Sequence, residues 1–205
     1  MFKRVFLLLS VTVLYVLCQT SVLAQGSGTT FSLPVASDSG GYRKFDSTAL
    51  AGKLHTGDDY YSRDLKALAT NCGVIVKKII NGQGDHGFGN AVIVRHNLMS
   101  GAVYSVYGHL AGFAQGVEEG RSVSRGQQIG TIGSTGSGSG GIVHLHFEIK
   151  RSATLANPSA FGSVRAETEF GYVSQRAGNR MTRSATDYGY FRPSSFYGGY
   201  VASCR

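Results

Sequence analysis

The chain has 205 residues, a formal charge of +8 and an apolar fraction of 42%. This length is enough for one domain with a hydrophobic core, and the apolar fraction excludes a chain that is disordered throughout. The 29 glycines and 11 tyrosines, with no tryptophan, favour short strands and tight turns over long helices. The basic residues are scattered and no nucleic-acid-binding motif is present, so we expect no nucleic acid partner.

Residues 1–24 have the pattern of a secretory signal peptide. Lys3 and Arg4 precede an apolar run over residues 5–17, and a stretch of small or slim residues ends at Ala24. We expect cleavage after Ala24 and a polar leader over residues 25–30. Removing two cations from +8 leaves +6 on the mature chain.

Two other interpretations of this segment stay open. A transmembrane anchor needs roughly 20 apolar residues, and the run here is shorter, so we expect no stable membrane span after cleavage. Lipid modification of Cys18 is the second alternative, which Leu17 disfavours because a small residue is wanted at that position.

Cleavage leaves two cysteines, Cys72 and Cys204. Two cysteines in an exported chain are consistent with an intrachain disulfide, which would tie the end of the chain to the domain. The alternative is two unpaired thiols, and the sequence leaves both open.

The central part of the chain predicts a mainly antiparallel β domain over residues 31–158. Residues 31–54 read as a loop with at most one short strand, and residues 62–70 as a short helix or turn. Five segments are rich in β-branched residues or alternate in polarity, as strands do. They cover residues 73–80, 91–96, 102–107, 127–132 and 142–149.

Residues 159–205 are expected to form a poorly structured C-terminal extension, rich in glycine, tyrosine, serine and arginine. The sequence of this extension does not by itself assign it a role.

The strongest chemical signal within a predicted strand is a pair of histidines, His144 and His146. Residues i and i+2 of a strand project from the same face, so both imidazoles point the same way while Leu145 and Phe147 face the other side. Alone, such a pair is more often structural than catalytic.

Two further elements carry histidine. In His55-Thr-Gly57-Asp-Asp59, the glycine lets the backbone bend so that a nitrogen and a carboxylate can converge. His109 follows Tyr107-Gly at the end of another predicted strand. Each alone would be a polar turn or a structural histidine. All three elements together in an exported β-rich chain favour a metal site.

These elements belong to a series of six ordered motifs that resembles the lysostaphin-type (M23) zinc peptidases of peptidoglycan. The resemblance runs from about residue 31 to about residue 158. The motifs are H-x-G-x-D at 55–59, G-N-x-V-x-x-x-H at 89–96, Y-x-H-L at 107–110, G-x-x-V-x-x-G-Q-x-I-G at 120–130, a Gly/Ser loop at 133–141 and H-L-H-F-E at 144–148.

The resemblance implies an antiparallel sheet with a groove over it and one zinc ion per chain, held by His55, Asp59 and His146. Three protein ligands and an open fourth position are typical of catalytic zinc. His109 and His144 would be catalytic without binding metal. One would take a proton from the attacking water, and either can stabilise the oxyanion or protonate the leaving amine; the assignment stays open.

Several positions depart from the pattern or remain unassigned. Asp58 stands where many relatives carry an apolar residue, and it can tune the metal or compete for it. We expect a buried, hydrogen-bonded role for His96 and a surface position for His86. Glu148 is a candidate for orienting a metal-ligating side chain without itself binding the metal.

The expected function is that of an exported zinc metalloendopeptidase, in the periplasm or the cell wall, that hydrolyses peptide bonds of bacterial peptidoglycan. Spacing alone supports only metal-assisted hydrolysis, and the resemblance supplies the substrate. The +6 charge suits a polyanionic envelope. The alternatives are a catalytically inert cell-wall binding protein that activates a separate amidase, and a zinc peptidase acting on proteins. The bond cleaved, the host's Gram type, the oligomeric state and any activating cleavage stay open. Three roles are also open for residues 159–205: binding the cell wall, covering the groove, or a disordered end tied down by Cys204.

Overall fold

The computed structural model describes residues 30–38, 40–41, 43–48, 52–153, 155, 171–177, 180–181 and 184–197. The predicted signal peptide and residues 25–29 of the leader lie outside these ranges. Among the described residues, no helix has both the length and the apolar character needed to cross a membrane.

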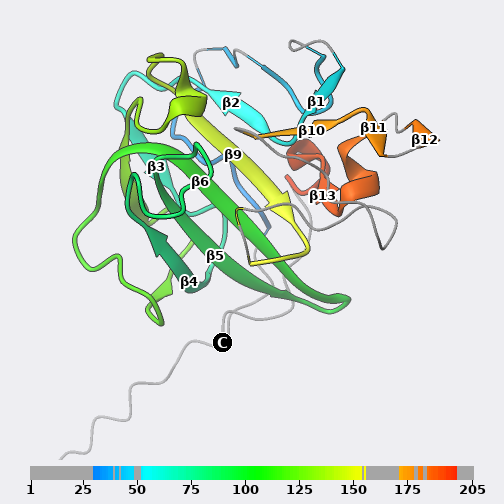
Figure 1. Cartoon of the computed structure of the whole chain (residues 1–205). Coiled ribbons are helices and arrows are strands. Elements are labelled where there is room, and N and C mark those ends of the chain that lie inside the picture. The colour runs from blue at the N-terminus through cyan, green and yellow to red at the C-terminus, as the bar shows by residue number, and fades with distance from the viewer. Residues whose placement is uncertain are drawn as a thin grey trace, which may run out of the picture.

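A nine-stranded antiparallel sheet forms the body of the domain (Figure 1). Its main path runs in the order β13-β9-β6-β5-β4-β7, while β2 also pairs with β9, and β8 pairs with β6 and β3. The strands are β2 Asp58–Tyr60, β3 Lys66–Leu68, β4 Gly73–Ile79, β5 Asn90–Leu98, β6 Gly101–Phe113, β7 Ser122–Val123, β8 Gln128–Ile132, β9 Leu145–Lys150 and β13 Tyr190–Phe191.

The five predicted strands are confirmed as β4, β5, β6, β8 and β9, and the mainly antiparallel fold with them. The prediction of a short helix or turn over residues 62–70 is wrong for its second half. Lys66–Leu68 form strand β3, which pairs with β8. Three residues are too few to show a period, so the sheet partner decides the conformation there.

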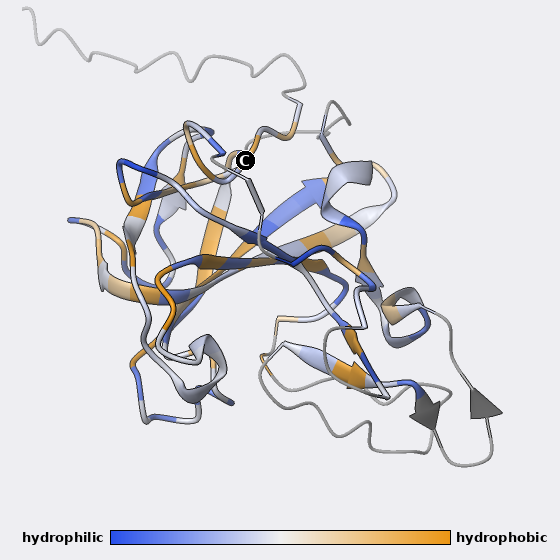
Figure 2. Ribbon diagram, turned by 90° about the horizontal axis from the view of Figure 1, so that it is seen from above, coloured by the Kyte–Doolittle hydropathy of each residue, from blue (hydrophilic) through white to orange (hydrophobic). Residues whose placement is uncertain are grey.

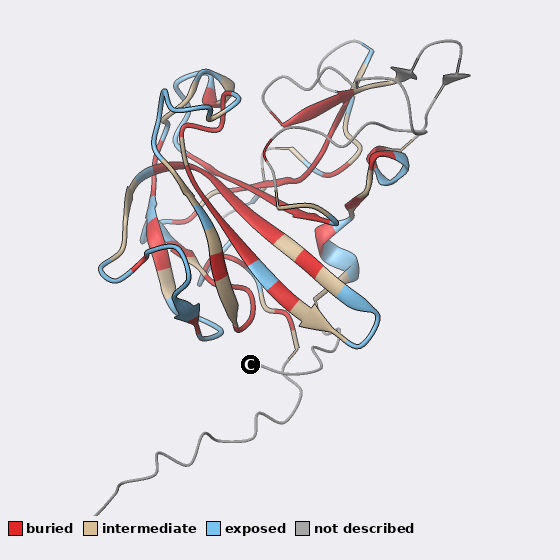
Figure 3. Ribbon diagram, turned by 60° about the horizontal axis from the view of Figure 1, so that its bottom comes forward, coloured by how far each residue is buried: buried red, intermediate tan, exposed pale blue. Residues whose placement is uncertain are grey.

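The main core lies on one face of the sheet. On β9, Leu145, Phe147 and Ile149 alternate onto this face and are fully buried. Figure 2 shows apolar stretches along the sheet strands, and Figure 3 shows that the central strands are largely buried. Since these residues fix one face of β9 inward, the residues between them must project from the other face.

The second face of the sheet is also covered. A smaller cluster of Phe88, Ala91, Ile93, Val106 and Leu155 is buried there. Val106 lies directly opposite both Ile93 of β5 and Glu148 of β9. Because directly opposed residues share a face, Glu148 and therefore His146 project from this second face.

The described parts of the C-terminal extension consist of short strands and 3-10 turns. Strand β10 (Tyr172–Ser174) pairs with β1 (Lys53–His55), and β13 joins the main sheet next to β9. The remaining elements are β11 Arg176–Ala177, β12 Arg180–Met181, η2 Ala185–Tyr188 and η3 Pro193–Ser195, while η1 Ser137–Ser139 lies in the Gly/Ser loop. The domain boundary at residue 158 stays a prediction.

Cys72 is buried and disulfide-bonded. Cys204 lies outside the described residues, so the pairing of these two cysteines stays a prediction.

Candidate metal centre

The three predicted ligands come together from three strands. His55 ends β1, Asp59 lies in β2 and His146 in β9, and one ligand atom from each lies within 4.8 Å of the others. Asp59 is directly opposite His146 in the β2–β9 pair, so their side chains share a face. All three side chains are buried.

The donor atoms form a nearly equilateral triangle. His55 Nε2 lies 3.3 Å from Asp59 Oδ1 and 3.1 Å from His146 Nδ1, and the third side, from Asp59 Oδ1 to His146 Nδ1, is 2.9 Å. Zinc–ligand bonds of about 2.0–2.1 Å in a tetrahedron place ligand atoms roughly 3.3–3.4 Å apart. The triangle matches this spacing to within about 0.5 Å, and two imidazoles with one carboxylate suit zinc.

Gly57 lies in a bend between His55 and Asp59, as predicted, and it also allows a close backbone approach. It does not have a positive φ angle. A Cβ at this position would instead lie 2.2 Å from the carbonyl oxygen of Phe147. The glycine therefore lets the turn between His55 and Asp59 approach the backbone of β9, which brings both side chains to His146.

Hydrogen bonds on the far side of each imidazole fix its orientation. Nδ1 of His55 lies 3.3 Å from the carbonyl oxygen of Lys44, which leaves Nε2 facing the triangle. Nε2 of His146 lies 3.1 Å from Oε1 of Glu148, which leaves Nδ1 facing it. Such partners set which ring nitrogen carries the lone pair.

In the metal-free site, burial and hydrogen bonds have opposite effects on the pKa values of Asp59 and His146. Burial alone would raise the pKa of Asp59, but hydrogen bonds with His146 and His55 outweigh it and hold the pKa far below its ordinary range. Burial alone would lower the pKa of His146, but hydrogen bonds with Asp59 and Glu148 raise it to about 9. At neutral pH His146 is thus an imidazolium between two carboxylates, and metal binding must displace a proton from Nδ1.

His109 and His144 lie beside this triangle, with their ring centroids 4.7 Å apart. Nδ1 of His109 lies 2.9 Å from the carbonyl oxygen of Thr135, and Nδ1 of His144 lies 2.9 Å from that of Ile142. A neutral imidazole that donates from Nδ1 keeps its lone pair on Nε2. Both rings therefore carry a basic nitrogen, and Nε2 of His144 lies 3.7 Å from Asp59 Oδ1.

Burial favours the neutral form of both of these histidines. Burial, followed by the charge of His146, lowers the pKa of His109 to about 3. Burial also lowers the pKa of His144. A neutral imidazole can accept a proton without first losing one, as a general base must.

The remaining predicted residues lie apart from the triangle. Asp58 accepts hydrogen bonds from the backbone N–H of Phe45 and from the Tyr60 hydroxyl, so it does not compete for a metal. His96 is fully buried and bonded to the Cys72 carbonyl and Ser105 Oγ, as expected. His86 is exposed, also as expected.

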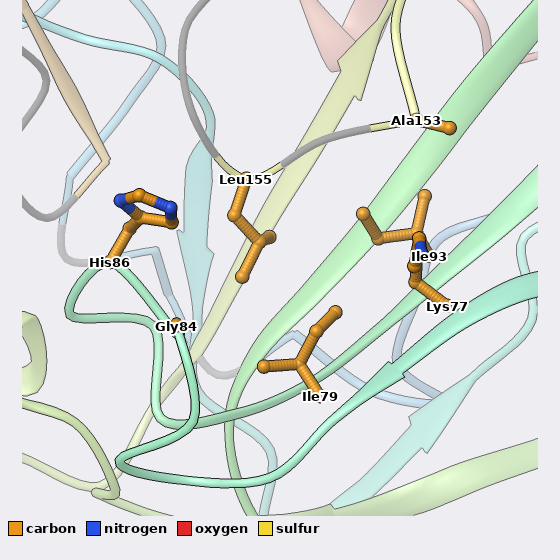
Figure 4. Close-up of a pocket in the computed structure, with 7 residues that line it drawn as sticks. All are labelled: Lys77, Ile79, Gly84, His86, Ile93, Ala153 and Leu155. Atoms are coloured by element: carbon orange, nitrogen blue, oxygen red, sulfur yellow. The ribbon is translucent and has the colours of Figure 1, made fainter.

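A cavity of about 230 Å³ lies on the metal-site face of the sheet (Figure 4). It is lined by Lys77, Ile79, Gly84, His86, Ile93, Ala153 and Leu155. Ile93 and Leu155 belong to the same cluster as Phe88, whose ring lies 5.3 Å from that of His146.

Among the residues that the sequence analysis did not single out, Thr56, Lys150 and Gly171 contact Glu148 or His146. The Thr56 hydroxyl bonds to Glu148, Lys150 pairs with Glu148, and the backbone of Gly171 packs against the His146 ring. Lys150 could have been found by extending the alternation 144, 146, 148 by one step. Nothing in the sequence points to Gly171.

Together these features define an antiparallel β protein with a buried His/Asp site suited to a metal and two neutral histidines beside it. The family described as peptidase family M23 matches residues 53–158, more than half of the chain. The chain belongs to this family.

Three relatives illustrate the range of similar proteins. The DD-carboxypeptidase/endopeptidase Mpg of Neisseria meningitidis serogroup B is 39% identical over 107 residues, which cover 52% of this chain and 22% of that protein. The L-Ala--D-Glu endopeptidase of Bacillus subtilis is 32% identical over 126 residues, 57% of this chain and 36% of that protein. The murein hydrolase activator NlpD of Escherichia coli is 38% identical over 77 residues, 38% of this chain and 18% of that protein.

Two solved structures are similar to parts of this chain. A zinc-containing peptidase from Vibrio cholerae is 26% identical, with a TM-score of 0.45 over 60% of this chain and 37% of that chain. A chain of the SpoIIQ–SpoIIIAH pore-forming complex is 20% identical, with a TM-score of 0.53 over 84% of this chain and 94% of that chain. The latter similarity concerns the fold alone.

Proposed function

We propose that this chain is an exported zinc metalloendopeptidase that hydrolyses peptide bonds in bacterial peptidoglycan. The observation that carries the proposal is the buried triangle of His55, Asp59 and His146, with donor atoms 2.9–3.3 Å apart and two neutral histidines beside it. A structural zinc site would be closed by a fourth protein ligand, commonly cysteine. Among the described residues the metal-binding group has three members.

In this proposal His55 Nε2, Asp59 Oδ1 and His146 Nδ1 hold the zinc ion. A zinc ion there supplies a Lewis acid that lowers the pKa of a water molecule and polarises the scissile carbonyl. The contact of His55 Nδ1 with a backbone carbonyl leaves Nε2 facing the metal position, and the depressed pKa of Asp59 keeps its carboxylate ionised, while His146 binds through Nδ1 once that nitrogen loses its proton.

His109 and His144 supply proton transfer and hydrogen bonding. Each has a neutral ring whose Nε2 lone pair is set by a bond from Nδ1 to a backbone carbonyl. One ring accepts the proton of the attacking water. Once protonated, that ring can donate a hydrogen bond from Nε2 to the developing oxyanion or deliver the proton to the leaving amine.

The substrate and location are proposed from relatives and composition. Two similar proteins are named a DD-carboxypeptidase/endopeptidase and an L-Ala--D-Glu endopeptidase. The matches span 22% and 36% of those proteins, so their bond specificity does not transfer. The predicted signal peptide and the net positive charge suit a substrate in the polyanionic envelope.

A second candidate function is that of an inert activator of a separate cell-wall amidase, which the similarity to NlpD favours. The presence of the complete ligand set and of both histidines favours the enzyme instead, because an inert activator has no need to retain them. A third candidate is a zinc peptidase that acts on proteins.

Digestion of purified sacculi by the mature chain tests these functions. We expect wild type and Glu118→Gln, which alters an exposed residue away from the site, to release muropeptides with new free amino groups, whereas His146→Ala releases none. Hydrolysis of a denatured protein but not of sacculi would favour the third function. A wild type that leaves sacculi intact yet accelerates an added amidase would contradict the proposal in favour of the activator.

A further inference from the structure

A line of charged side chains leads away from the ligand triangle along one face of β9. His146, Glu148 and Lys150 alternate with core residues, so all three project from the same face. Nε2 of His146 lies 3.1 Å from Glu148 Oε1, and Glu148 Oε2 lies 3.3 Å from Lys150 Nζ. Glu148 and Lys150 are 0% exposed.

Glu148 selects the nitrogen of His146 that faces the triangle. An ionised carboxylate only accepts hydrogen bonds, so Nε2 of His146 must carry the hydrogen in this contact. Once the proton on Nδ1 is lost, the lone pair lies on that nitrogen, which faces Asp59 and His55. Carboxylates that bind the far nitrogen of a ligand histidine in this way fix its orientation and increase its basicity.

Thr56 holds the same carboxylate oxygen from the opposite side. Its Oγ1 lies 2.5 Å from Glu148 Oε1 and 2.6 Å from the carbonyl oxygen of Gly171, and its backbone N–H donates to that carbonyl at 2.9 Å. The hydroxyl has a single proton to share between these two acceptors. Thr56 immediately follows His55 and also bonds to the carboxylate that contacts His146, so it connects the two histidine ligands.

Lys150 supplies the positive charge that offsets the cost of burying the Glu148 carboxylate. Neither Glu148 Oε2 nor Lys150 Nζ has a hydrogen-bond partner within the described part of the chain, so the two groups compensate each other as an ion pair. Lys150 Nζ also lies 5.0 Å from the centre of the Tyr190 ring, from strand β13 of the extension. A buried pair of this kind is a poor source of stability compared with apolar residues, which favours a functional reason for its presence.

We propose that Glu148 is a positioning residue for His146, and that Thr56 holds Glu148 in place. Their role is to keep Nδ1 of the histidine directed at the metal. This inference rests on the proposed zinc site. Neither residue contacts the reacting atoms in this proposal.

Zinc affinity, measured by competition with a chromophoric chelator, tests the inference without relying on activity. Glu148→Gln leaves the Lys150 charge buried and unpaired and will unfold more easily. The double variant Glu148→Gln/Lys150→Met removes both charges, so it keeps the fold while losing the charged acceptor. We expect the double variant to bind zinc about 10- to 100-fold more weakly than wild type.

Thr56 gives an independent and milder perturbation. Thr56→Val has nearly the same shape without the hydroxyl, and we expect a several-fold loss of zinc affinity, which Thr56→Ser restores. Glu118→Gln is the matched control, because Glu118 pairs with Lys78 at an exposed site, and its affinity should equal that of wild type. Wild-type affinity in both the double variant and Thr56→Val would overturn the inference. A wild-type protein that binds no zinc would overturn the proposed function as well. Zinc binding by the wild type therefore distinguishes failure of the inference from failure of the proposed function.

Discussion

Gly171→Ala is the substitution that most sharply tests whether the C-terminal extension supports the metal centre. Gly171 has a φ of +78°, and a Cβ there would lie 2.6 Å from Cε1 of His146. Its carbonyl oxygen accepts hydrogen bonds from the backbone and the hydroxyl of Thr56. The extension therefore contacts both the ligand ring and the residue that holds its hydrogen-bond partner.

The expected effect of Gly171→Ala has two parts. An alanine in the left-handed region costs about 1–2 kcal/mol of stability wherever it occurs. The contact adds a local effect, because carbon atoms pack at about 3.5–4.0 Å, so the ring or the extension must move by about 1 Å. A displacement of about 1 Å in a catalytic group can cost roughly 10²-fold in rate.

Gly126→Ala separates the general cost of an alanine in the left-handed region from the local effect of the contact with His146. Gly126 has a φ of +79°, and nothing lies within 4 Å of its Cβ position. We expect both variants to lose similar stability in urea, but only Gly171→Ala to lose about 10²-fold in kcat/KM on sacculi, together with zinc affinity. Unchanged or increased hydrolysis in Gly171→Ala, with wild-type zinc affinity, would refute a supporting role for the extension.

Three further predictions concern proton transfer, pH and the disulfide. His109→Asn, chosen because asparagine tolerates the φ of +60° at this position, should retain zinc but lose about 10²- to 10⁴-fold in hydrolysis; an active variant would contradict its role. In the metal-free protein the pKa of His146 is raised from 6.5 to about 9, so its stabilising contribution is complete below pH 6.5 and is lost as pH rises through 9. Denaturant unfolding should lose roughly 3 kcal/mol over this interval without zinc and much less with it, and a pH-independent metal-free stability would argue against the imidazolium. Peptide mapping under non-reducing conditions should recover Cys72 linked to Cys204, and Cys204→Ser should cost about 2–5 kcal/mol of stability; a free Cys204 thiol would contradict the pairing.

Much of the sheet was predictable because its strands carry their own periodicity. The alternation over residues 142–149 correctly placed Leu145 and Phe147 in the core and His146 on the other face. Strand β3 was missed because three residues cannot display a period, and its pairing with β8 supplies the conformation.

The convergence of the three ligands was expected from the family resemblance and the bend at Gly57 from the residue type, but the close approach of Gly57 to β9 was not. A single sequence does not reveal that the Phe147 carbonyl would lie against a side chain there. The contribution of the extension was equally hidden, since the contacts of Gly171 with His146 and Thr56 join residues more than 20 positions apart without any local pattern.

Zinc content of the purified mature chain, measured by mass spectrometry for wild type, Asp59→Asn and Asp58→Asn, tests the central claim most directly. Asp59 faces the ligand triangle, while the neighbouring Asp58 is bonded to Phe45 and Tyr60 instead. The account predicts about one zinc ion per chain in wild type and Asp58→Asn and a large loss in Asp59→Asn. A wild type without zinc, or equal zinc in both variants, would contradict it.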